Sequence, residues 1–139
     1  MSLFSKRNVE DAVAPQLLED GVEYEMTILG MEDKSGEGPK GPWENTSIRL
    51  ACMAEPNSTD VYVTFWPPKA DSSASAKARS DWELKSFMAC FGLEPEDLAN
   101  LEDRLWAEKT GFCVMKQKPR YNDPETIENV VKTWKPQSN

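Results

Sequence analysis

The seven residues from 60 to 66, Asp-Val-Tyr-Val-Thr-Phe-Trp, constrain the fold most, because they alternate with the period of a β-strand. The odd positions are apolar and suit a core: Val61, Val63 and Phe65. The even positions place Tyr62 and Trp66 on the opposite face. Two aromatic side chains exposed on one strand favour a binding partner, and a nucleic-acid base is one candidate because every base has a flat face that can stack. The alternative is that a helix or a second sheet covers this face.

Four further stretches have the pattern of strands. With the stretch above, the predicted strands are residues 22–28, 46–52, 60–66, 111–116 and 127–134. The predicted connections are a long Gly- and Pro-rich loop at 34–42, a turn at 55–58 and a loop at 119–124. The first three strands are therefore expected to form a meander.

A helix is predicted from Ser80 or Asp81 to Phe91, with Gly92 closing its end. Its apolar stripe consists of Trp82, Leu84, the stem of Lys85, Phe87, Met88 and Phe91. Trp82 and Phe87 are expected in the core. Residues 69–80 are small and polar and are expected to be mobile. A short second helix is predicted from Pro95 to about Leu101.

The order of three strands, a helix and two strands predicts the fold class. It is typical of a mainly β, five-stranded Greek-key barrel of the OB type, with the helix between strands three and four. A small β-sandwich would normally have more strands and no mid-chain helix. We expect residues 21–136 to form this OB-fold domain and residues 1–20 to form an N-terminal arm.

Composition favours a non-enzymatic protein of the cytoplasm. The 139 residues contain no histidine, so the usual general base at neutral pH is missing, and no metal or other cofactor is expected. Cys52, Cys90 and Cys113 are widely spaced and are expected to be reduced core thiols. No apolar run approaches a membrane span, and the start does not resemble a secretion signal. The stretch Gly36–Gly41 matches a dinucleotide-binding pattern, but Pro39 and Pro42 exclude the helix that such a site needs.

Charge is distributed unevenly over this acidic chain. The net charge is −8, yet residues 109–139 contain 6 Lys and Arg against 3 Asp and Glu, a local balance of +3. A basic end on an acidic body is typical of proteins that bind polyanions. In OB barrels the ligand lies on strands two and three, between the loop joining strands one and two and the loop joining strands four and five. The residues predicted to bind nucleic acid are Lys34, Lys40, Trp43, Arg49, Tyr62, Trp66, Lys116, Lys118, Arg120, Tyr121, Lys132 and Trp134.

Two alternatives stay open for this set. The lysines of the last hairpin could instead be solubilising charges on an edge ribbon, with Trp134 folded back on the core. The exposed aromatic residues could also form a protein interface, since such interfaces favour Trp, Tyr and Arg.

The chain resembles a family, the small OB-fold single-stranded DNA-binding proteins of bacteriophages and prophages. The resemblance covers most of residues 17–136 and rests on four segments: the strand 21–28, the strand 61–67, the helix end 84–93 and the closing strand 128–134. It implies a protein without catalytic residues that coats single-stranded DNA during replication and recombination in the host cytoplasm. The implied partners are single-stranded DNA, phage or host replication and recombination proteins, and further copies of the chain, but no membrane. Many such proteins end in an acidic tail, whereas this chain ends in Trp-Lys-Pro-Gln-Ser-Asn. The alternative function is a phage structural or protein-interaction domain.

Overall fold

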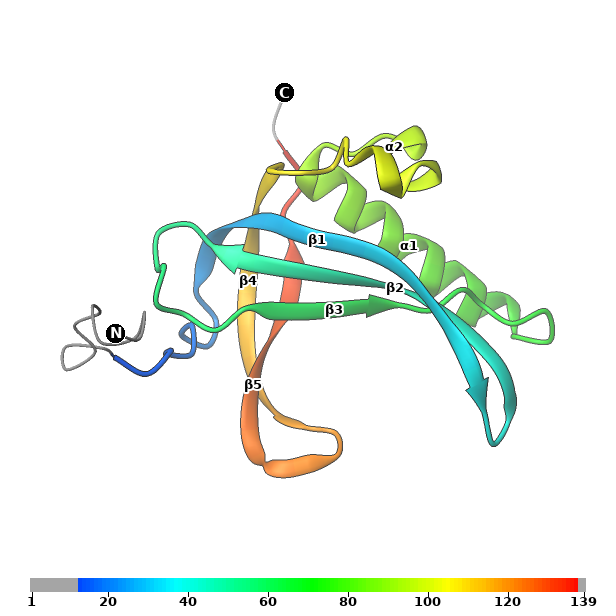
Figure 1. Cartoon of the computed structure of the whole chain (residues 1–139), viewed down its shortest axis with the longest axis horizontal. Coiled ribbons are helices and arrows are strands. Elements are labelled where there is room, and N and C mark those ends of the chain that lie inside the picture. Colours follow the sequence, from blue (N-terminus) through cyan, green and yellow to red (C-terminus); the bar gives the residue numbers. More distant parts are fainter. Residues whose placement is uncertain (1–12, 138–139) are drawn as a thin grey trace, which may run out of the picture.

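A five-stranded antiparallel sheet dominates the computed structural model, which describes residues 13–137 (Figure 1). The strands are β1 (Glu23–Gly38), β2 (Gly41–Cys52), β3 (Val61–Phe65), β4 (Thr110–Arg120) and β5 (Asp123–Trp134). Their order in the sheet is β3-β2-β1-β4-β5. The helices are α1 (Ala74–Phe91), α2 (Pro95–Ala99) and the 3-10 turn η2 (Leu101–Asp103). The mainly β class, the five strands and the helix between strands three and four are confirmed.

Alternation fixes which face of the sheet is buried. Met26 and Ile28 of β1 are buried, and a register shift between Ile28 and Gly30 restores the pattern so that Met31 is buried too. In β2 and β3 the buried residues are Ile48, Leu50, Cys52 and Val61. Because strand side chains alternate, the residues next to these positions in the regularly paired stretches lie on the outer face of the sheet.

Helix α1 begins earlier than predicted. It starts at Ala74, where the Ser73 hydroxyl oxygen accepts a hydrogen bond from the Ala76 N–H at 3.2 Å. The expectation of a mobile segment at 69–80 is therefore wrong for its second half, because a capping serine and helix-forming alanines extend the helix. Its end at Gly92 is confirmed, and the left-handed φ of 67° there favours glycine. Trp82 was expected in the core but is 67% exposed, since the buried side of α1 consists of Phe87, Cys90 and Phe91.

An aromatic cluster joins this helix to both edges of the sheet. The ring of Phe87 lies 5.3 Å from Phe65, 5.3 Å from Phe91 and 5.2 Å from Trp134, measured between centroids. Phe65 belongs to β3 and Trp134 to β5, and their rings are 6.4 Å apart. These contacts bring the two edge strands together under the helix.

The predicted barrel closure is not confirmed. Closure requires hydrogen-bonded pairing between β3 and β5. Within residues 13–137 the ladders join β3 to β2 and β5 to β4, and the two edge strands meet through side chains.

Two predicted loops are instead β-ribbons that project from the sheet (Figure 1). The β1–β2 ribbon, residues 32–47, is paired as far as Gly38 and Gly41. The β4–β5 ribbon, residues 116–128, is paired as far as Arg120 and Asp123. No residue of either ribbon is buried. Glycine and proline residues were the basis of the loop prediction. They are also compatible with tight turns, and the backbone pairing continues on both sides of those turns.

Residues 16–20 pack against the sheet rather than standing apart from it. Leu18 is buried, and its N–H donates to Oδ1 of the buried Asn129 at 2.8 Å. The amide of Asn129 donates in turn to the Leu18 carbonyl oxygen at 3.0 Å. The Gln117 N–H donates to Oδ1 of Asp20 at 2.7 Å. This segment therefore belongs to the folded unit.

Replacing Asn129 by alanine is expected to lower the free energy of unfolding by about 2 kcal/mol, because the buried Leu18 N–H loses its acceptor. The Leu18 carbonyl oxygen keeps a second donor, Gln117 Nε2 at 2.9 Å. Urea denaturation followed by circular dichroism measures the loss. Asn122→Ala, in the exposed turn of the β4–β5 ribbon, is the matched control and should change stability by less than about 0.5 kcal/mol. Equal stability of the two variants would contradict the assignment.

Candidate nucleic-acid interface

The outer face of β2 and β3 carries most of the predicted aromatic residues. The register pairs Arg49 with Tyr62 across the two strands, and Trp66 follows on the same side just after β3. Tyr62 is 60% exposed and Trp66 56% exposed, so the prediction that they point away from the core is confirmed. We call Trp43, Arg49, Tyr62 and Trp66 the aromatic face.

Trp43 reaches this face from the β1–β2 ribbon. Its ring lies 6.0 Å from that of Trp66 between centroids, at an interplanar angle of 62°, which is an edge-to-face contact. Trp43 is paired across the ribbon with Gly36, and its indole lies over that glycine. A Cβ at position 36 would come within 2.7 Å of Cζ2 of Trp43. The absence of a side chain at Gly36 therefore sets the position of the indole.

Replacing Gly36 by alanine is expected to displace the Trp43 ring and to break its contact with Trp66 while the ribbon stays paired. The near-ultraviolet circular dichroism of the two indoles and their fluorescence measure the change. Gly38→Ala is the matched control, because a Cβ there meets Cδ1 of Trp43 at 3.6 Å, an ordinary contact. Identical spectra for the two variants would show that Gly36 does not position the ring.

Arg49 lies beside Tyr62, and its guanidinium forms an ion pair with Asp60. Its Nε is 3.5 Å from Oδ2 of Asp60, and both side chains are partly exposed. The ion pair orients the guanidinium at the edge of the aromatic face but also offsets part of its charge.

Two of the predicted cations, Lys34 and Lys40, lie on the β1–β2 ribbon. The Lys34 ammonium is 3.4 Å from Oε1 of Glu32, and Lys40 lies exposed in the turn at the ribbon tip. Lys34 shares the outer side of the ribbon with Trp43 because the register places Gly36 and Lys34 two residues apart.

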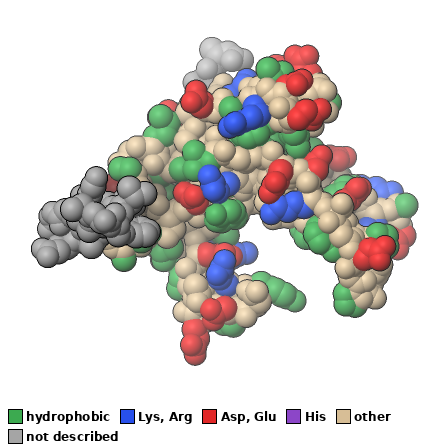
Figure 2. Space-filling view, viewed as in Figure 1, with side chains coloured by type: hydrophobic (Ala, Val, Ile, Leu, Met, Phe, Trp, Pro, Cys, Tyr) green, Lys and Arg blue, Asp and Glu red, His purple; other side chains and the backbone are tan. Residues whose placement is uncertain are grey.

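The β4–β5 ribbon carries the second group of predicted residues. Lys116 and Lys118 are exposed on one side of β4, Lys132 is exposed on β5, and Tyr121 is fully exposed in the turn. The Nε of Arg120 is 3.5 Å from Oε2 of Glu128. Figure 2 shows the two ribbons as separate arms with an open space between them. The predicted residues are therefore distributed over two arms and the surface that joins them.

Trp134 does not lie with the others. It packs on Phe65, Phe87 and Phe91 in the aromatic cluster. The alternative in which Trp134 folds back on the core describes its position, and we leave it out of the interface. The apolar residues that precede Trp134 in β5 do not show, from the sequence alone, whether its ring lies at the interface or in the core.

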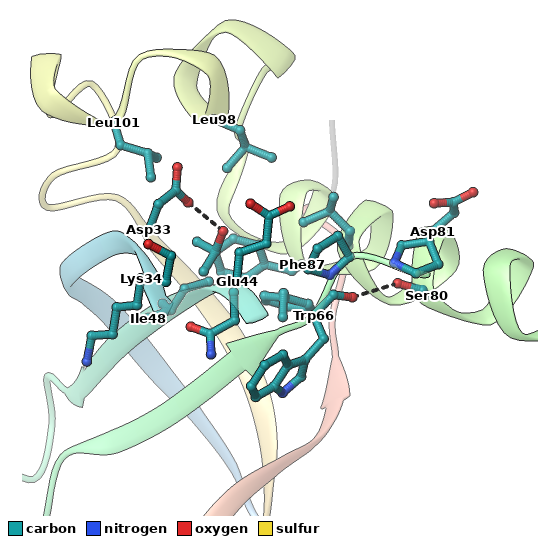
Figure 3. A pocket seen from close by; sticks show the side chains of 17 residues that line it. Asp33, Lys34, Glu44, Ile48, Trp66, Ser80, Asp81, Phe87, Leu98 and Leu101 are labelled. Atoms are coloured by element: carbon teal, nitrogen blue, oxygen red, sulfur yellow. Dashed lines mark hydrogen bonds between the residues drawn. The ribbon is translucent and has the colours of Figure 1, made fainter. Parts of the chain in front are cut away.

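A cavity of about 500 Å³ borders the aromatic face and was not predicted (Figure 3). We call it the helix groove. It lies between the β1–β2 ribbon, the end of β3, and helices α1 and α2. Its apolar lining is Ile48, Phe65, Pro67, Pro68, Leu84, Phe87, Leu98 and Leu101. Trp66 lines its edge, and the Trp66 carbonyl oxygen accepts a hydrogen bond from Ser80 Oγ at 3.3 Å.

Within residues 13–137 no group of three or more Cys, Asp and Glu side chains could hold a metal ion. Cys90 and Cys113 are buried, with their sulfur atoms 3.9 Å apart. The hydrogen bond with Cys90, together with burial, raises the pKa of the Cys113 thiol, so this thiol stays protonated at neutral pH.

Comparison with family models and with curated proteins gave no match. None of the helices between residues 13 and 137 has the length and apolar character to cross a membrane.

Proposed function

We propose that this chain binds single-stranded DNA without sequence preference and performs no chemical step on it. The observation that carries the proposal is the aromatic face. Trp43 and Trp66 touch each other farther along the same outer face as the Arg49 and Tyr62 pair, and all four side chains are exposed. Unpaired bases can stack on such rings regardless of their identity. Duplex DNA keeps its bases stacked inside the double helix, so only its phosphates would interact with the protein, through the cations.

The two ribbons would hold the phosphates on either side of the stacked bases. Their cations are Lys34, Lys40, Lys116, Lys118, Arg120 and, at the base of the second ribbon, Lys132. Together with Arg49 they make seven, of which Lys34, Arg49 and Arg120 have ion-pair partners. We therefore assign most of the phosphate attraction to the other four.

The proposal includes an OB-type architecture for the sheet. The order β3-β2-β1-β4-β5 and the position of α1 between β3 and β4 support it, as does the Phe65–Trp134 contact between the edge strands. The use of the protein in phage replication and recombination, and in the host cytoplasm, rests on the family resemblance.

The salt dependence of binding tests this function. Four released counterions predict that the logarithm of the association constant falls with the logarithm of salt concentration with a slope of about −3. Quenching of tryptophan fluorescence by oligo-dT at several salt concentrations measures the slope. Replacing Lys116 and Lys118 by alanine should reduce its magnitude by about 1.4.

Duplex DNA of equal length is the control ligand and should bind much more weakly. If oligo-dT does not bind even at low salt, the proposal is wrong. Concentration-dependent association of the protein that buries Trp66 would then favour the protein-interaction alternative.

A further inference from the structure

The helix groove has an apolar floor and an acidic rim. Asp33, Glu44 and Asp81 line it, one near each end and one in the middle (Figure 3). Among the described residues none of these three carboxylates has a cationic partner within ion-pair distance. Lys34 is the only cation among the described residues of the lining; its ammonium points away from the groove in Figure 3 and is paired with Glu32. The groove is therefore negative as well as apolar.

Nucleic acid does not fit these features, because its phosphates would meet three carboxylates. A peptide fits all of them. An aliphatic side chain can fill the space between Leu84, Leu98 and Leu101, and basic side chains can pair with the rim. A cavity of about 500 Å³ is large enough for one or two such side chains.

We propose that the helix groove is a docking site for a short segment of a partner protein in which basic residues flank an aliphatic one. This inference goes beyond the proposed function and does not depend on it. The site shares Trp66 with the aromatic face but uses the opposite sign of charge. The chain would thus bind an anionic ligand and a cationic ligand on neighbouring surfaces.

A fluorescein-labelled octapeptide of alternating lysine and leucine is the probe, and fluorescence anisotropy measures its binding. The variant Glu44→Lys/Asp81→Lys reverses two exposed rim charges and should weaken binding about tenfold or more. Glu55→Lys/Glu125→Lys makes the same change in net charge at exposed sites outside the groove and should leave the affinity within about twofold. An octapeptide with glutamate in place of lysine should not bind.

Three results would overturn the proposal. The first is no saturable binding of the lysine–leucine peptide to the unmodified protein. The second is an equal loss in both double variants, which would mean general attraction to an acidic protein. The third is a dimer of this chain that only the rim variant disrupts, without peptide binding, which would assign the groove to a second copy. Oligo-dT binding is measured in parallel, and loss of peptide binding alone in the rim variant supports a separate site.

Discussion

Replacing Tyr62 and Trp66 together by alanine is expected to weaken binding of oligo-dT by about 100-fold or more while the protein stays folded. Each stacked base contributes about 1–3 kcal/mol, and the double variant removes two stacking platforms. Both side chains are more than half exposed, so little core packing is lost. Tryptophan fluorescence titration of the remaining indoles, or a gel shift with labelled oligo-dT, measures the affinity.

Trp82→Ala is the matched control for this experiment. Trp82 is exposed to a similar degree but lies on α1, and its ring takes no part in the contact between Trp43 and Trp66. It should bind oligo-dT as the unmodified protein does. If Trp82→Ala weakens binding as much as the double variant does, the aromatic face is not the stacking surface. Loss of the fold in the double variant would show that those rings support the core.

Replacing Phe87 by alanine is expected to lower the free energy of unfolding by about 3–5 kcal/mol, a large share of the stability of a domain of this size. Phe87 is fully buried and contacts Phe65 of β3, Phe91 of α1 and Trp134 of β5. Its removal leaves a cavity at the point where the helix joins both edges of the sheet. Urea denaturation monitored by circular dichroism gives the difference.

Two results would distinguish this role from ordinary burial of an aromatic ring. Trp82→Ala, in the same helix, should change the stability by less than about 0.5 kcal/mol because that ring is exposed. The Phe87→Ala protein should also show faster hydrogen exchange in both β3 and β5, since both lose a packing partner. A loss confined to one edge strand would contradict the bridging role.

Alternation made the strands of the core predictable. Met26, Ile28, Ile48, Leu50 and Val61 are buried, and their polar neighbours are not, as a sheet with one buried face requires. The same rule identified Tyr62 and Trp66 as outward residues. These predictions needed only the period of a strand and the hydrophobic effect.

The extents of the ribbons and of α1 could not be predicted in this way. Neither ribbon has an apolar face, so hydrophobic periodicity carries no signal where backbone pairing alone continues. Residues 74–79 are likewise exposed, and the helix there depends on the Ser73 cap. Barrel closure depends on the distance between β3 and β5, which local patterns do not encode.

The candidate interface was predictable in part. The residues of the aromatic face were identified, but not the contact between Trp43 and Trp66, because Gly36 and Trp43 only become partners through the ribbon register. Trp134 was expected at the interface and is packed in the aromatic cluster. Trp82 was expected in the core and is exposed. Single tryptophans in amphipathic segments do not show from sequence alone which side they occupy.

The two ribbons can change in length without a change in the core. Since neither buries a residue, their lengths are free of the constraints that fix the core. Adding two residues to each strand between Trp43 and the turn would extend the arm and leave every side chain on its original side. Adding one residue to each strand would exchange the two sides beyond the insertion. Insertions that differ in length by even steps would therefore change how far the arm extends without a new fold.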